Sequence, residues 1–285
     1  MGLNIIARGG VAPVSAPVYG HLLNTGAMRL AFRPTSENNA FDLSNDEHTL
    51  TKSGSLLYTP AGMLVSGNGG VEVSGLQFLT LDSYTILAVV SASNLKLTDD
   101  NNKGIAILGD YVSGNSSTML YIETYNSVST IRVVFGGYNT TTNAVANSNR
   151  TFAVPSAYIV SNSDGTYNIK PIFIAAHIDL SNGDSGAQRI FIPSTQVAPV
   201  YENIFSVSGA AAKFGKTAKA LGQVNTAQSV KIGYSANGVG TASSKTIKCA
   251  RVDSVALTQQ QIIDQYQATK KWLTAEGVLN ISHWI

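Results

Sequence analysis

The feature that most constrains the fold is a repeated pattern of short runs rich in β-branched and aromatic residues. From about residue 41 these runs alternate with clusters of Gly, Asn, Asp and Ser at intervals of roughly ten residues. Such spacing is typical of an all-β sandwich or barrel. We therefore predict an antiparallel β-sandwich, with candidate strands at 56–58, 63–65, 71–73, 84–91, 104–108, 119–125, 130–135, 158–161, 167–178, 187–192, 229–234 and 246–256.

The charge content excludes several classes of partner. Charged residues make up 13% of the chain, about half of the usual quarter, so Ser, Thr, Asn and Gly must cover much of the surface. The net charge is +2, and the Lys and Arg residues are too dispersed to form the basic stripe that nucleic acids need. We expect no nucleic-acid partner and no attraction to an anionic membrane surface.

The cysteine content and the N-terminal sequence bear on disulfide bonding, export and membrane insertion. The single cysteine, Cys249, excludes an internal disulfide and is expected to be a small core residue. The first residues, MGLNIIARGGVAPV, lack the charged start and long apolar stretch of a signal peptide. No apolar run approaches the roughly 18 residues of a membrane span. We expect a protein without a signal peptide or a transmembrane segment.

Residues 1–40 differ from the rest of the chain. Pro13, Pro17 and several glycines interrupt short apolar pieces, and no period is sustained. The segment is nevertheless too apolar for a solvated tail. We predict an extended docking arm that lies against its own domain or a neighbouring subunit, leaving 41–285 as one domain, although a first edge strand followed by a loop remains an alternative. The arm residues expected to dock are Leu3, Ile5, Ile6, Val11, Val14 and Val18.

One helix is predicted near the end of the chain. Thr258 and Gln261 have the spacing of a capping box, Leu257 precedes them as a hydrophobic staple, and Gly277 is placed to end the helix. Between them an apolar stripe recurs every three or four residues. The helix should pack on the sheet as part of the same domain, through Ile262, Ile263, Tyr266, Thr269, Lys270 and Leu273.

Four blocks of sequence resemble the laminin-G-like, concanavalin-A-like jelly roll over roughly residues 41–277. They are YTILAVVSAS, FIAAHIDLSNGDSGAQRIFIP, VKIGYSANG and IKCARVDSVALTQQQIIDQY. The last is the most specific, because Asp253 and residues 257–266 fit the closing strand and helix of that family. Two loops depart from the pattern, at GTASSKT and at Pro193-Ser194. The resemblance implies a jelly-roll sandwich with one C-terminal amphipathic helix.

Two catalytic motifs are matched only superficially. The GDSG segment at 183–186 imitates the nucleophile segment of trypsin-like proteases, but Ser185 lies eight residues after His177, across one hairpin turn. We interpret it as a turn. The segment GAAAKFGKT at 209–217 has five residues between its glycines where a phosphate-binding loop has four. Neither motif predicts a catalytic residue.

A cation site is the alternative interpretation of one polar loop. Asp99, Asn101 and Asp110 stand at positions one, three and twelve of a segment that resembles a calcium loop, but Lys103 occupies position five, which requires an oxygen ligand. We predict a polar turn. Calcium remains open as a cofactor, because laminin-G-like jelly rolls often bind it at the rim of the sandwich.

One strand carries a candidate glycan-binding site. Tyr121, Glu123 and Tyr125 alternate along the segment YIETY, and Tyr138 and Asn139 follow on a later strand or loop. Aromatic faces stack on sugar rings, and amide and carboxylate edges bind hydroxyls. An ordinary exposed cross-strand stripe is the alternative. The acidic residues are unpaired and the four histidines are far apart in sequence, so glycan cleavage is not indicated.

These observations favour a non-enzymatic virion structural protein of a bacteriophage, on the tail or decorating the capsid. The low charge, the single cysteine, the missing export signal and the apolar arm all fit that role. Its partners would be other virion proteins, copies of itself in a homo-oligomer (a trimer by analogy with phage fibres) and a host surface glycan. The alternatives are a stand-alone carbohydrate-binding module or adhesin and, third, a jelly-roll glycan lyase or hydrolase.

Overall fold

The structure is a computed structural model, and it describes residues 27–40, 42–44, 46, 48–78, 81, 83–96, 104–110, 118–125, 130–135, 150–179, 187–192, 200–203, 229–234 and 244–284. Several predicted features lie outside these residues. They are the arm residues Leu3, Ile5, Ile6, Val11, Val14 and Val18, the loop residues Asp99, Asn101, Tyr138, Asn139 and Ser185, and the segment 209–217.

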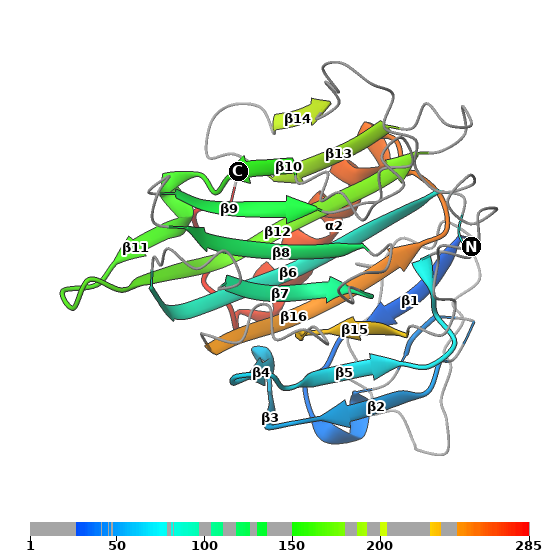
Figure 1. Ribbon diagram of the computed structural model, residues 1–285, viewed down its shortest axis with the longest axis horizontal. Coiled ribbons are helices and arrows are strands. Elements are labelled where there is room, and N and C mark those ends of the chain that lie inside the picture. The colour runs from blue at the N-terminus through cyan, green and yellow to red at the C-terminus, as the bar shows by residue number, and fades with distance from the viewer. Residues whose placement is uncertain are drawn as a thin grey trace.

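Two antiparallel sheets, A and B, stack face to face, and helix α2 (Gln259–Glu276) lies behind sheet A (Figure 1). Sheet A has the order β14-β13-β12-β6-β16-β4-β3, with β1 also on β16 and β11 also on β12. Sheet B has the order β10-β9-β8-β7-β15-β5-β2. The strands of sheet A are β1 (Met28–Phe32), β3 (Leu56–Thr59), β4 (Gly62–Val65), β6 (Tyr84–Leu95), β11 (Ile159–Ser161), β12 (Tyr167–Asp179), β13 (Ala187–Ile192), β14 (Val200–Asn203) and β16 (Ser244–Asp253). Those of sheet B are β2 (Leu50–Ser53), β5 (Gly70–Val73), β7 (Gly104–Gly109), β8 (Met119–Tyr125), β9 (Thr130–Phe135), β10 (Arg150–Ala153) and β15 (Val230–Ile232).

The sequence of β6, the central strand of sheet A, follows from its position in the sandwich. β6 pairs with β12 on one side and β16 on the other, and it lies between sheet B and the helix. Both of its faces are therefore covered, and residues 84–90 are all buried. The continuous apolar run TILAVV is the pattern that such a strand requires. The predicted antiparallel sandwich with a C-terminal helix is confirmed.

The N-terminal boundary of the domain differs from the sequence-based expectation. Residues 28–32, placed in the arm by their position, form β1, and Leu30, Ala31 and Phe32 are buried against the sandwich. Two short 3-10 helices, η1 (Glu37–Asn39) and η4 (Ser156–Tyr158), lie in the connections. Residues 27–40 thus include an edge strand followed by a loop, the alternative left open above, and docking by residues 1–26 remains a prediction.

Helix α2 (Gln259–Glu276) begins and ends where the capping signals indicate. Thr258 and Gln261 form the capping box, and Gly277 ends the helix in the left-handed conformation. The buried residues include Gln265 and Trp272, which the apolar stripe did not contain, while Ile263 and Lys270 are only half-buried. None of the helices in the described ranges combines the length and apolarity needed to cross a membrane.

Aromatic rings join α2 to sheet A. The ring of Phe173 on β12 lies 5.5 Å from that of Tyr266, and the ring of Trp284, after the helix, lies 5.4 Å from Tyr266. The indole of Trp284 donates a hydrogen bond to the carbonyl of Pro171 at 2.7 Å. These contacts make the C-terminal helix and the residues that follow it part of the same packed unit.

Candidate binding face and N-terminal anchor

The alternation of β8 places the predicted glycan-binding positions on the outer face of sheet B. Leu120 and Ile122 are fully buried in the core between the sheets. Tyr121 therefore lies on the opposite face, where it is half-buried, and Glu123 and Tyr125 occupy positions on the same face of the strand. The structure thus brings three of the five predicted positions onto one strand face.

Tyr121 has apolar neighbours on this outer face. Ala106 on β7 is its partner in the strand register, and Met119 lies two residues earlier on β8. The three form a small hydrophobic cluster separate from the main core. Ala106 and Met119 are 0% and 3% exposed, so within this cluster the half-buried ring of Tyr121 is the accessible part, and an aromatic ring is a group on which a sugar ring can stack.

A charged pair stands on the same face beyond β7. Glu72 on β5 and Lys231 on β15 are register partners, and each lies between two buried core residues, so both occupy outward positions. The Lys231 ammonium lies 5.9 Å from the centre of the Tyr234 ring. Burial, together with nearby Glu72, raises the pKa of Tyr234. Sequence reasoning missed these residues, although a charged residue flanked by apolar ones in VEV and VKI was the available signal.

Asp110, the described member of the predicted calcium set, is buried at the end of β7. It is 1% exposed, and its carboxylate accepts a hydrogen bond from the Thr118 N–H at 2.7 Å. Its second carboxylate oxygen has no hydrogen-bond partner in the described part of the chain. Burial raises the pKa of Asp110 to about 7. Within the described residues no three His, Cys, Asp or Glu side chains gather as a metal site would require, and calcium binding stays a prediction.

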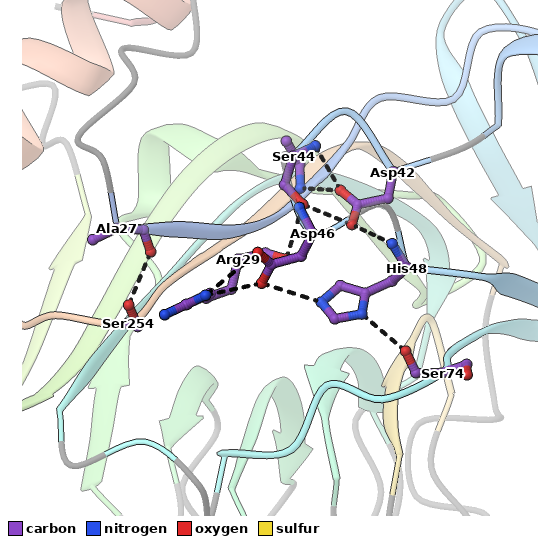
Figure 2. A network of polar contacts seen from close by, with 9 residues as sticks. Ala27, Arg29, Asp42, Ser44, Asp46, His48, Ser74 and Ser254 are labelled. Atoms are coloured by element: carbon purple, nitrogen blue, oxygen red, sulfur yellow. Dashed lines mark hydrogen bonds and ion pairs between the residues drawn. The ribbon is translucent and has the colours of Figure 1, made fainter.

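A polar network holds the first strand of the sandwich in place (Figure 2). The Asp42 carboxylate accepts hydrogen bonds from the backbone N–H groups of Ala31 (3.0 Å), Ser44 (2.8 Å) and His48 (3.1 Å). One of these donors, Ala31, belongs to β1, so the aspartate caps an edge of that strand. The Ala27 carbonyl accepts hydrogen bonds from the backbone and hydroxyl of Ser254. The point where the chain enters the domain is thereby fixed to the end of β16.

The same network reaches the other sheet. Arg29 pairs with Asp46 at 3.3 Å, and the Asp46 carboxylate lies 3.7 Å from His48 Nε2. His48 Nδ1 lies 2.9 Å from the carbonyl of Ser74, which follows β5 of sheet B. Although Ser, His and Asp side chains meet here, the Ser44 hydroxyl hydrogen-bonds with Asp42. The arrangement is therefore an anchor between sheets rather than a nucleophile with its base.

His177, the histidine near the protease-like segment, lies buried on β12. Its register partners are Thr85 on β6 and Arg189 on β13. This position is inside sheet A, where His177 is buried, and Ser185 lies outside the described residues.

The architecture defines an antiparallel β-sandwich of jelly-roll type with one packed C-terminal helix. No model of a known protein family matches the sequence, and no curated protein matches it. Solved structures do match. The chain is similar to botulinum neurotoxin type C, whose cell entry is dependent upon interaction with two ganglioside molecules (TM-score 0.55, 15% identity, 85% of this chain and 51% of that one).

Two further matches come from the same group of toxins. They are the receptor binding domain of botulinum neurotoxin D (TM-score 0.53, 12% identity, 86% of this chain, 53% of that one) and the binding domain of botulinum neurotoxin DC in complex with rat synaptotagmin II (TM-score 0.54, 14% identity, 86% and 52%). This chain spans about half the length of those chains. At such identities the likeness shows the sandwich fold, and it does not extend to a laminin-G identity or a bacteriophage origin.

Proposed function

We propose that the protein is a non-catalytic binding domain that presents the outer face of sheet B to a glycan or a protein receptor. The observation that carries the proposal is the half-buried ring of Tyr121, set beside Ala106 and Met119 on that face. Lys231 on β15 and Glu72 on β5, the second and third strands from β8, lie on the same face and supply a cation and an anion for the polar groups of a ligand. An aromatic platform with a polar rim suits recognition of sugars.

The structural neighbours support the class of function. Botulinum neurotoxin type C interacts with gangliosides, and a botulinum neurotoxin DC binding domain is complexed with synaptotagmin II. Because the same sandwich hosts many functions, this analogy supports receptor binding in general and names no ligand for this chain.

In its finer form the proposal makes the protein a structural component of a bacteriophage virion. Residues 1–26 would dock it to other virion proteins or to copies of itself, and the sandwich would face the host surface. The apolar sequence of that segment, entering the domain at a firmly anchored Ala27, supports this form. Deleting residues 1–26 should then abolish incorporation into particles and leave glycan binding unchanged. If the protein is instead a stand-alone carbohydrate-binding module, the same deletion should leave glycan binding unchanged, and neither the full chain nor the shortened one should be incorporated into particles.

The binding proposal is tested by one pair of tyrosine variants. Wild-type protein should bind a subset of surface glycans with a Kd between millimolar and micromolar, about 4 to 8 kcal/mol. Tyr121→Ala should weaken binding by about tenfold or more, since stacking contributes on the order of 1 kcal/mol or more. Tyr167→Ala on β12, another half-buried tyrosine, is the control and should bind as wild type does.

Two results would contradict the proposal. One is glycan binding that Tyr121→Ala leaves unchanged, which would remove this face as the site. The other is release of reducing ends from a host-surface polysaccharide, which would show that the protein is an enzyme.

A further inference from the structure

The two opposite charges on the outer face of sheet B do not form an ion pair. Glu72 on β5 and Lys231 on β15 are register partners, and side chains that face each other across two strands are close enough to pair. The ion pairs found within the described residues nevertheless include neither of them. The other neighbours of each side chain explain why.

Tyr234, which follows β15, engages the carboxylate of this pair. Its hydroxyl donates a hydrogen bond to the Glu72 carboxylate and also bonds with the side chain of Ser53 on β2. Hydrogen bonds to an ionised group are among the stronger ones, so Glu72 is held at Tyr234. A carboxylate has about four acceptor sites, which leaves Glu72 able to accept a ligand hydroxyl as well.

The position of the Tyr234 ring depends on a glycine beneath it. A Cβ atom at Gly70 on β5 would lie 2.3 Å from Tyr234 Cδ1 and 2.3 Å from the carbonyl oxygen of Ile232. Both distances are far shorter than a contact between non-bonded atoms. The missing side chain of Gly70 therefore lets Tyr234 lie against β5, where its hydroxyl reaches Glu72.

The Lys231 ammonium keeps donors that are not used within the described residues. It donates to the carbonyl of Ser229 at 3.2 Å, and an ammonium has three N–H groups. The Tyr234 ring, with its centre 5.9 Å away, lies at the limit of a cation–π contact. Lys231 is half-buried, so its charge is screened less than that of an exposed lysine. A ligand carboxylate would meet a cation whose register partner is held by another residue.

Asp110 is a further acidic neighbour of Lys231. It follows Gly109, the register partner of Lys231 on β7, and it interacts electrostatically with the lysine. Asp110 is buried, and burial raises its pKa to about 7. At pH 6 this acid is therefore largely neutral and does not compensate the charge of Lys231.

Lys231 and Tyr121 are close enough to contact one ligand. Lys231 pairs with Gly109 on β7, and Gly109 pairs with Met119, two residues before Tyr121 on β8. With strands about 4.8 Å apart and a rise of about 3.4 Å per residue, the backbones at Lys231 and Tyr121 lie about 12 Å apart. A short oligosaccharide can span that separation.

We propose that Tyr234 is a positioning residue that holds Glu72 and thereby leaves the Lys231 ammonium to the carboxylate of an acidic saccharide. The ligand is then a carboxylate-bearing oligosaccharide with one ring on Tyr121 and its carboxylate at Lys231. The inference rests on the binding function proposed for this face. It adds the charge of the ligand and the residues that select it.

Matched pairs of ligands test the selection by charge. Uronate-containing oligosaccharides are arrayed as free acids and as methyl esters, which keep the ring and lose the charge, and binding is measured at pH 6 and constant ionic strength. The wild-type protein should bind at least one acid about tenfold or more tighter than its ester, since hydrogen bonds between charged groups are the stronger ones. Lys231→Met should bring the ratio close to one by weakening binding of the acid. Lys271→Met, at an exposed position of α2, is the control and should keep the wild-type ratio.

Removal of one hydroxyl tests the positioning role of Tyr234. Tyr234→Phe keeps the ring on Gly70 and releases Glu72, which can then pair with Lys231 and compete with the ligand. The preference for the acid should fall about threefold or more, in line with the strength of a partly exposed ion pair. Combining Tyr234→Phe with Glu72→Gln removes the competing carboxylate and should recover the wild-type preference. A merely structural role of Tyr234 would give no such recovery.

The outcomes separate this inference from the binding function on which it rests. Equal binding of acids and esters that Tyr121→Ala weakens would overturn the inference and leave the binding function standing. A preference for acids that Lys231→Met or Tyr234→Phe leaves unchanged would also overturn it, as would a double variant without recovery. If neither acids nor esters are bound, the inference is overturned, and binding of neutral glycans decides the proposed function separately.

Discussion

At the scale of single residues, the charges buried under α2 are the part of the fold least visible in the sequence. Arg33 and Lys248, far apart in the chain, both pair with Glu276 at the end of the helix. Their cationic groups also lie 4.0 Å and 5.1 Å from the Trp272 ring. Lys and Arg are usually exposed, so a sequence pattern places them on the surface, and only the packing of α2 against β16 shows otherwise.

Glu276 should therefore be a determinant of stability. Glu276→Gln would leave two buried cations without their shared carboxylate, and breaking a buried ion pair from one side is costly. We expect a loss of about 3 kcal/mol in the free energy of unfolding, measured by urea denaturation. Asp264→Asn, at an exposed position of the same helix, serves as the control and should change it by less than about 0.5 kcal/mol. Equal losses in the two variants would show that the buried ion pairs do not stabilise the fold.

Asp110 should make stability depend on pH in a defined window. Burial raises its pKa from 3.8 to about 7 in the folded protein, with Lys231 and Tyr84 as the neighbouring ionisable groups. The favourable contribution of the neutral acid is fully present below pH 4 and is lost as pH rises towards 7. Asp110→Asn, which cannot ionise, should therefore gain stability relative to wild type across that window and then level off. Each unit of pKa difference between the folded and unfolded states corresponds to about 1.4 kcal/mol, and we expect the gain in the free energy of unfolding to be at least that large. A difference between the two proteins that is constant from pH 4 to 8 would show that Asp110 does not titrate in this way.

At the scale of elements, the sequence predicted those features of the helix and strands that depend on residues close together in the chain. The capping box, the glycine at the helix end and the uninterrupted apolar run of β6 are read within a few residues, and all are found in the structure. Short strands such as β1 and β2 have too few residues for a period to emerge. The same distinction applies to the candidate site. The alternation along β8 is a local signal and predicts the face on which Tyr121 lies, whereas Lys231 is brought to that face by pairing between strands that are distant in the sequence.

The residues after α2 should stabilise the packing of that helix on sheet A. Trp284 packs on Tyr266 and donates to the Pro171 carbonyl. Trp284→Ala should lower the free energy of unfolding by about 3 to 5 kcal/mol, the usual range for a buried tryptophan. In thermal unfolding followed by circular dichroism, Val278→Ala should melt close to wild type because Val278 is 44% exposed. Equal melting temperatures for the two variants would show that this segment is not part of the core.

At the scale of the whole molecule, the domain boundary should fall before β1. Removing residues 1–26 leaves β1 in place, whereas removing residues 1–40 deletes the buried Leu30 and Phe32 and exposes the edge of β16. We expect the shorter deletion to fold with a wild-type melting temperature and the longer one to aggregate or lose cooperative unfolding. If both deletions are equally stable, β1 is dispensable and the arm extends to residue 40.

The central claim is that this sandwich binds its ligand on the outer face of sheet B without transforming it. The most direct test is titration of isotope-labelled protein with a glycan selected from an array, followed by amide chemical shifts in NMR. The account predicts that the shifted signals cluster on β7, β8 and β15 around Tyr121 and Lys231, and that the glycan is recovered intact. Shifts confined to other elements, such as the β11–β12 hairpin or α2, or a cleaved glycan, would contradict it.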